Sequence, residues 1–106
     1  FSDCTHLEAV KLPKGITEIG ISAFSGCFSL KEIVIPKNVK RIGSFAFQYC
    51  MDLREVVIPE CVKEIGDYAF SICYNLEDVE IPDTEIVWGE HVFVSSGKYE
   101  HFLNDN

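Results

Sequence analysis

Apolar and polar positions alternate over a short segment that ends at Pro36. Ile33 and Ile35 stand two positions apart, which is the spacing of a β-strand with one buried face. Such a strand directs these two side chains inward and directs Glu32 and Val34 outward. Pro36 ends the strand, because a proline nitrogen has no proton to donate to a continuing ladder. The pattern therefore predicts a short strand with one exposed face.

The residues after this strand predict two further elements. Val39 and Ile42 return to the interior from a second short strand or extended turn. Gly43 then permits a sharp change of direction, for which we expect a positive φ angle. The apolar residues of 44–50 are spaced by three and four, as on one face of a helix, so we predict a short helix or 3₁₀ turn there. These apolar residues are Ala46, Phe47 and Cys50.

The whole pattern recurs every 23 residues. One column of equivalent positions holds cysteine in four successive repeats, another holds phenylalanine in five, and others hold proline and glycine in four. The first two columns are Cys4, Cys27, Cys50 and Cys73, and Phe1, Phe24, Phe47, Phe70 and Phe93. A single turn buries too few apolar groups to offset the entropy of ordering its backbone. We therefore predict that turns stack on one another and that the phenylalanines share one interior.

Residues 53–73, LREVVIPECVKEIGDYAFSIC, closely resemble the BspA-like leucine-rich repeat family. The hallmark is an isoleucine–proline pair, an isoleucine–glycine pair, and alanine–phenylalanine with a cysteine three residues later. One repeat carries it as Ile35-Pro36, Ile42-Gly43, Ala46-Phe47 and Cys50. The resemblance covers about residues 1–93. It implies a surface-displayed or secreted protein of host-associated bacteria or some protists, linked to adhesion to host proteins, other cells or matrix.

We therefore predict an α/β leucine-rich repeat solenoid: stacked 23-residue turns with a parallel β-sheet on one face and short second strands and helical turns on the other. Residues 1–82 are expected to form the regular solenoid of about four turns, and residues 83–106 an atypical last repeat and C-terminal cap. The boundary rests on the decay of the pattern after Pro82, where Glu85 takes an apolar position. Residues expected to close the core are Trp88, Val92, Phe93, Phe102 and Leu103. Because the sequence opens within a turn, we expect a piece of a longer solenoid.

The charge is unevenly distributed along the chain. Residues 1–76 hold nine acids and eight bases, whereas residues 77–106 hold eight acids and the single base Lys98, which together give the net charge of −8. An acidic chain without clustered bases argues against binding of nucleic acid. The acidic end is interpreted as a solvated solenoid terminus, with a docking surface for a basic partner as the alternative. No segment approaches the ~20 apolar residues of a membrane span, and the chain does not open with a signal peptide pattern.

Residues with catalytic or metal-binding potential do not assemble into a motif. The five cysteines include no closely spaced pair, so no metal site is expected. The cysteine column is predicted to be a reduced, buried ladder, with a disulfide between adjacent turns such as Cys27–Cys50 as the alternative. His91 and His101 each follow a glutamate but form no zinc motif, and no nucleophile elbow or phosphate-binding glycine loop occurs. We expect no catalytic residue, cofactor or metal.

The outward positions of the main strand are the candidate binding surface. One outward column is Ala9, Glu32, Glu55 and Asp78, and the next is Lys11, Val34, Val57 and Glu80. Stacking places members of a column ~4.8 Å apart, so Val34 and Val57 form an apolar centre with a charged rim, as protein-binding patches often do. The alternative is that valine occurs there because it favours strands. The candidate partner-binding residues are Lys11, Glu32, Val34, Glu55, Val57 and Glu80. Lys31 and Arg54, at the strand starts, are expected to offset the neighbouring acidic column.

Three functional hypotheses remain open at this point. The first is a noncatalytic interaction or adhesion module of a surface-displayed or secreted protein, which binds a protein or other macromolecule through its sheet face. The second is a structural spacer or a self-assembly domain that associates through the open N-terminal end of the solenoid. The third is an accessory domain of an extracellular enzyme.

Overall fold

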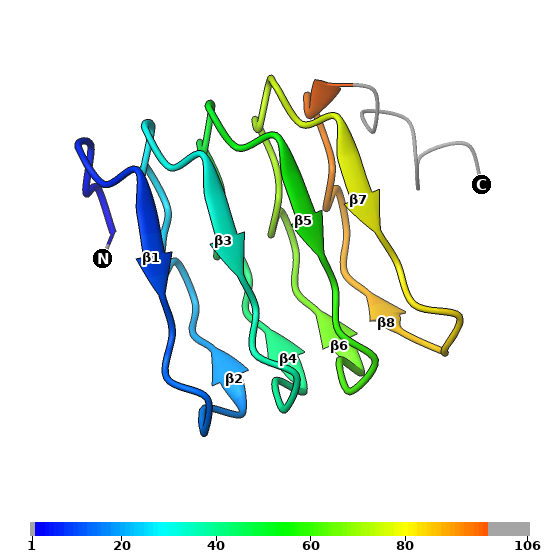
Figure 1. Cartoon of the computed structure of the whole chain (residues 1–106). Coiled ribbons are helices and arrows are strands. Elements are labelled where there is room, and N and C mark those ends of the chain that lie inside the picture. Colours follow the sequence, from blue (N-terminus) through cyan, green and yellow to red (C-terminus); the bar gives the residue numbers. More distant parts are fainter. Residues whose placement is uncertain (1, 98–106) are drawn as a thin grey trace.

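A computed structural model describes residues 2–97, which form two parallel β-sheets side by side along one axis (Figure 1). The first sheet has the order β1-β3-β5-β7, with strands Ala9–Lys11, Glu32–Val34, Glu55–Val57 and Asp78–Glu80. The second has the order β2-β4-β6-β8, with strands Glu18–Ile19, Arg41–Ile42, Glu64–Ile65 and Val87–Trp88. Each repeat contributes one strand to each sheet, so the chain is a parallel β-solenoid.

Each strand pairs with the strand 23 residues later in the sequence. In the first sheet Val10 lies opposite Ile33, and in the second sheet Ile19 lies opposite Ile42. Ile33 is buried and Val34 is exposed, as the period-two alternation predicted. The strand before Pro36 and the second strand that ends at Ile42 are both confirmed.

The phenylalanine column forms the spine of the core. The rings of Phe24, Phe47, Phe70 and Phe93 are all buried and stack almost parallel, with centroids 5.4, 5.1 and 5.6 Å apart in that order. Stacked rings bury a large apolar area in every turn and join each turn to the next. The prediction that these side chains share one interior is confirmed.

The predicted helical turns are wrong, and with them the α/β class. Residues 2–97 contain no α-helix, and residues 44–49 form consecutive turns instead. The Phe45 N–H donates to the Asp67 carbonyl at 2.9 Å, and the Phe47 N–H donates to the Ala69 carbonyl at 2.7 Å. In a helix these groups would bond within their own segment, four residues back. The backbone satisfies them on the next turn of the solenoid, which a helix could not do.

Backbone conformations in the left-handed region explain why this segment forms turns rather than a helix. Phe45 and Tyr49 have φ angles of 60° and 65°, and the equivalent Tyr68 and Ile72 have φ angles of 58° and 56°. A side chain in this region costs roughly 1–2 kcal/mol per residue, and it reverses the handedness that a helix requires. Stacking offsets part of the cost, because the Phe45 and Tyr68 rings lie 5.3 Å apart. The pattern of hydrophobic positions does not predict positive φ angles at bulky residues.

Gly43 is required for space rather than for a positive φ angle. Among residues 2–97 only Gly26 and Gly97 are glycines with positive φ, so our expectation for Gly43 is wrong. A Cβ atom on Gly43 would lie 2.7 Å from the backbone nitrogen of Ile21 in the preceding turn. The absent side chain lets adjacent turns approach closely at this corner.

The last described repeat continues the core. Val92 and Phe93 are buried, and Trp88 packs against Phe93 with ring centroids 5.9 Å apart. Phe102 and Leu103 lie outside the described residues. The division of the chain at residue 82 therefore stays a prediction. No helix in residues 2–97 has both the length and the apolar character needed to cross a membrane.

The glycine column yields a matched test of close stacking. A Cβ on Gly66 would lie 2.5 Å from the Ser44 nitrogen, whereas a Cβ on Gly20 meets nothing within 4 Å. We expect Gly66→Ala to lower the free energy of unfolding by about 1–3 kcal/mol, because backbone must move apart. Gly20→Ala should change it by about 1 kcal/mol or less. Urea unfolding measures both. Equal effects of the two substitutions would contradict close stacking as the reason for glycine.

Candidate functional site

All six predicted partner-binding residues lie at outward positions of the first sheet. Every strand of this sheet has an exposed first and last residue on either side of a more buried one. These outward residues include Lys11, Glu32, Val34, Glu55, Val57 and Glu80. The alternation of the strands, together with the parallel register, therefore places them on one face. Whether they bind a partner stays a prediction.

The centre of this face is apolar. Val34 is 75% exposed and Val57 is 54% exposed, which is unusual for aliphatic side chains of this size in the middle of a sheet. Lys11 lies opposite Val34 in the register of β1 and β3, and Val57 lies opposite Glu80 in that of β5 and β7. The column therefore runs from a cation through two valines to an anion.

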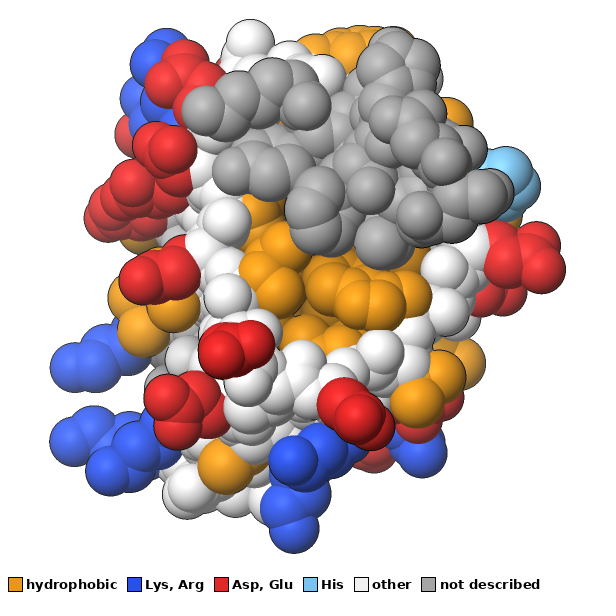
Figure 2. Space-filling view, turned by 90° about the vertical axis from the view of Figure 1, so that its right-hand side faces the viewer, with side chains coloured by type: hydrophobic (Ala, Val, Ile, Leu, Met, Phe, Trp, Pro, Cys, Tyr) orange, Lys and Arg blue, Asp and Glu red, His pale blue; other side chains and the backbone are white. Residues whose placement is uncertain are grey.

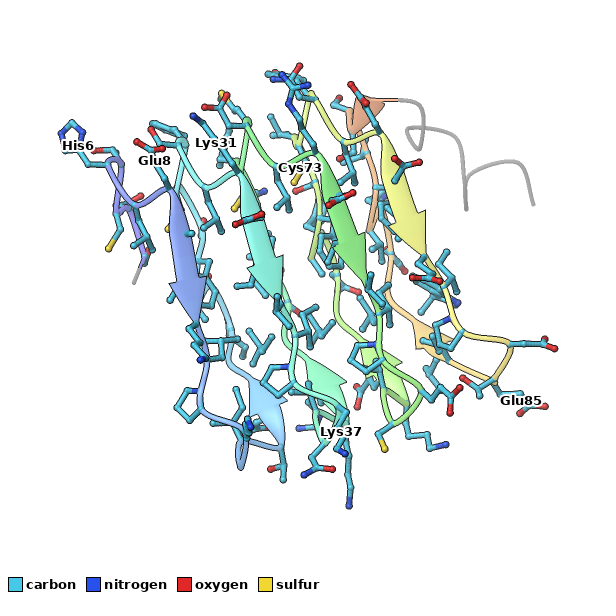
Figure 3. All side chains as sticks on the ribbon, in the orientation of Figure 1. His6, Glu8, Lys31, Lys37, Cys73 and Glu85 are labelled. Carbon is cyan, nitrogen blue, oxygen red and sulfur yellow. The ribbon has the colours of Figure 1, made fainter. Side chains whose placement is uncertain are left out.

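The neighbouring outward column is acidic. Glu32 pairs in register with Glu55, and Glu55 pairs with Asp78. Like charges on adjacent strands, ~4.8 Å apart, destabilise a sheet. The bases at the strand starts form their ion pairs with other acids, so the expected offset of this acidic column stays a prediction. Figure 3 shows Lys31 beside Glu8, 3.4 Å away, and the equivalent base of the next repeat, Arg54, lies 3.9 Å from Glu77.

A groove opens on this face beside β1 and β3. Its volume is about 930 Å³, and apolar groups of Leu12, Val34 and Pro36 line it. The charged side chains that line the groove are three lysines, Lys11, Lys14 and Lys37, and one acid, Glu32. Within residues 2–97 none of the three lysines forms an ion pair. The groove is therefore a locally cationic site on a chain whose net charge is −8.

Lys14 and Lys37 are site residues that sequence reasoning missed. They follow the prolines that end the strands, where the alternation of side chains no longer predicts direction. One signal was present: the column reads Lys14, Lys37, Glu60 and Asp83, so its charge changes sign midway along the solenoid. Figure 2 looks at the C-terminal end, where acidic side chains flank exposed hydrophobic ones.

The second sheet offers a different exposed surface. Arg41 bridges two acids, with Nε 3.1 Å from Glu64 Oε1 and Nη1 3.8 Å from Glu18 Oε2. These pairs are solvent-exposed and contribute about 1 kcal/mol or less. Ile21 and Val87 are 74% and 71% exposed on this side. They are far apart in the sequence and form no paired centre comparable to Val34 and Val57.

The cysteine column has a hydrogen-bonding role. The Cys50 thiol donates to the Phe24 carbonyl at 3.3 Å, and the Cys73 thiol donates to the Phe47 carbonyl at 3.2 Å. Ser96, the equivalent residue one repeat later, donates its hydroxyl to the Phe70 carbonyl. The predicted burial is confirmed for Cys27, Cys50 and Cys73, whereas Cys4 is only partly buried. The thiols therefore satisfy core carbonyls as well as filling space.

Burial also suppresses the reactivity of these thiols. Desolvation raises the pKa of the Cys50 thiol, and the neighbouring cysteines of the column raise it further. Desolvation raises the pKa of Cys73 to about 12, against a lowering contribution from its backbone hydrogen bond. A thiol that stays protonated is a poor nucleophile and a poor metal ligand. The exposed cysteine is Cys61, which lies outside the column.

The histidines add no catalytic arrangement to the described chain. The His91 ring stacks against Tyr68 with centroids 5.3 Å apart, and His6 lies at the N-terminal end of the solenoid (Figure 3). His101 lies outside the described residues. Residues 2–97 contain no group of three or more histidine, cysteine or acidic side chains placed to hold a metal ion.

Comparison with known proteins agrees with this architecture. A family model for the BspA type leucine rich repeat region, in 6 copies, matches residues 1–103. None of the curated proteins matches the sequence. The crystal structure of a T. pallidum leucine rich repeat protein is similar, with a TM-score of 0.80 and 36% identity over 84% of this chain and 42% of that one.

A second similar structure is a leucine-rich repeat protein from Bacteroides ovatus. It has a TM-score of 0.74 and 30% identity, and the match covers 92% of this chain and 31% of that chain. The chain therefore spans less than half the length of either structure. Both neighbours are bacterial leucine-rich repeat proteins.

The raised thiol pKa values predict a loss of stability at alkaline pH. The unfolded chain releases thiol protons above about pH 9, whereas the folded chain retains the Cys73 proton until about pH 12. The stabilisation is present below pH 9 and is lost as the pH rises through this window, by about 1.4 kcal/mol per pH unit and thiol. Cys73→Ser, which copies Ser96, should make the decline of unfolding free energy with pH shallower. Cys61→Ser serves as the control, and equal slopes in both variants would contradict the prediction.

Proposed function

The chain belongs to the BspA-type leucine-rich repeat family, and we propose that it is a noncatalytic interaction module that binds another macromolecule through the exposed face of the β1-β3-β5-β7 sheet. Leucine-rich repeat proteins generally bind proteins, so a protein is the favoured partner. The six outward residues named above would form the contact, with Lys14 and Lys37 at its edge.

The paired valines carry this proposal. Two adjacent strands expose Val34 and Val57 side by side, although the core beneath them is closely packed. Burying both in an interface would recover apolar surface at roughly 25 cal/mol per Å². The charged residues around them, Lys11 and Glu80 in particular, supply the polar rim that gives such a patch its specificity.

The rigidity of the solenoid supports the same function. Ring stacking and backbone hydrogen bonds connect each turn to the next, so the outward side chains are held at fixed spacing. A preformed surface loses little conformational entropy when it binds. The outward positions of this face hold carboxylates, lysines and valines, which suit the contacts of a binding surface.

We further propose a surface-displayed or secreted location and a role in adhesion. The support is the family, which is generally associated with surface or secreted bacterial proteins. A spacer function and an accessory role beside an enzyme are the competing functions. Neither requires the exposed valines to contact a partner, so binding experiments separate them from the proposal.

Aspartate substitutions test the binding face. We expect Val34→Asp combined with Val57→Asp to weaken binding to a panel of purified host matrix proteins by at least about tenfold, because binding would bury two charges without partners. Val87→Asp is the matched control on the second sheet and should leave binding unchanged. Surface plasmon resonance measures affinity, and circular dichroism verifies folding. Unchanged binding in the double variant would favour the spacer function.

A further inference from the structure

The charges of the first sheet face are ordered along the solenoid. Two columns of equivalent positions, one on this face and one in the turns that follow its strands, begin with cations at the β1 end and finish with anions at the β7 end. The column within the strands is Lys11, Val34, Val57 and Glu80, and the column after the prolines is Lys14, Lys37, Glu60 and Asp83. Each column reverses its sign about its own midpoint, between β3 and β5.

These charges have no partners within the described chain. Ion pairs in residues 2–97 involve the bases Lys31, Arg41 and Arg54, all of which lie outside the two columns. The six charged residues of the two columns make none: Lys11, Lys14, Lys37, Glu60, Glu80 and Asp83. The face and the turns that follow its strands therefore carry three cations and three anions that form no ion pair within residues 2–97, on either side of two exposed valines.

We propose that this face binds a second copy of the chain about a twofold axis. The axis lies in the interface, parallel to the strands and midway between β3 and β5. Such an axis reverses the order of each column, so it pairs every cation with an anion and each valine with the other. Its contacts are Lys11 with Glu80, Val34 with Val57, Lys37 with Glu60 and Lys14 with Asp83 of the second copy. Because a twofold interface is self-complementary, every contact occurs twice. The proposal rests on the binding face of the proposed function and names a second copy as one partner.

The groove beside β1 and β3 fits the opposite end of the same face. It combines an apolar lining with three lysines, and its volume is about 930 Å³. The region around β5 and β7 offers the complementary chemistry, with the exposed Val57 and the half-buried Pro59 near Glu60 and Glu80 in the sequence and the register. The two halves of one surface thus match each other in both polarity and charge.

The acidic column opposes this association and limits its strength. Under the same axis Glu32 faces Glu55 of the second copy, which is a like-charge contact. Four strands spaced ~4.8 Å apart, with about six residues each, cover on the order of 300–400 Å² per copy. That area lies below the range of stable complexes and is typical of weak, transient ones. Glu55→Gln removes part of the repulsion and is expected to tighten the dimer by at least about twofold.

Charge reversal in trans provides the test. We expect sedimentation equilibrium of the full chain, at up to millimolar concentration, to show a dimer that weakens as salt is added. Lys37→Glu and Glu60→Lys should each weaken it by about tenfold or more, because each substitution sets like charges against one another in both copies. An equimolar mixture of the two variants should restore dimerisation, since every introduced charge then faces its opposite. Lys63→Glu, at an exposed position directly before β6 of the second sheet, is the control and should leave the dimer unchanged.

Two results would overturn the proposal. One is a chain that stays monomeric at millimolar concentration, and the other is a mixture that associates no better than either variant alone. The proposed function is tested separately, at concentrations where the chain is monomeric. Loss of matrix-protein binding in the double aspartate variant, together with failure of the dimer test, would leave the binding face intact and remove only the second copy as its partner.

Discussion

Hydrogen bonding between successive turns is the constraint on which the rest of the structure depends. Backbone N–H groups in the strands bond to carbonyls of a neighbouring turn, and so does every second N–H group of the segment that follows the second strand, such as those of Phe45, Phe47 and Tyr49. This requires every turn to have the same length and path, which is why the 23-residue period is strict. It also brings equivalent atoms of adjacent turns within ~5 Å, so Gly43 and Gly66 must lack a side chain.

Because the repeats stack, residues that are 23 positions apart in the sequence form rows of side chains along the solenoid. In the interior the rows are homogeneous: phenylalanine rings stack, and thiols or a hydroxyl bond the carbonyl of the phenylalanine in the preceding turn. On the surface the residue type can change along a row, because an outward side chain does not pack in the core. The change from lysine to acid along the first sheet face is of this kind. The binding properties of such a protein therefore depend on how charge and polarity change along each outward row.

Two uses of one face have a physical consequence. A second copy and a different macromolecule would compete for Val34 and Val57, because both cover the same valines. A weak self-association shields exposed apolar groups at high local concentration, where they would otherwise promote aggregation. A partner that covers more of this surface would displace the second copy. Repulsion between Glu32 of one copy and Glu55 of the other keeps the face from binding itself tightly.

The sequence alone determined the stack, the strands and the identity of the inward and outward rows. Period-two alternation and the 23-residue repeat are local properties, and Pro36 marks the strand end without help from the rest of the molecule. The tertiary structure decided the remainder. A spacing of three and four among Ala46, Phe47 and Cys50 suits a helix and a run of turns equally well, and only the carbonyls of the adjacent turn select between them. The direction of Lys14 and Lys37 likewise follows from turn geometry after the proline, which no pattern of polarity encodes, so the groove and its charge emerge only when the turns are stacked.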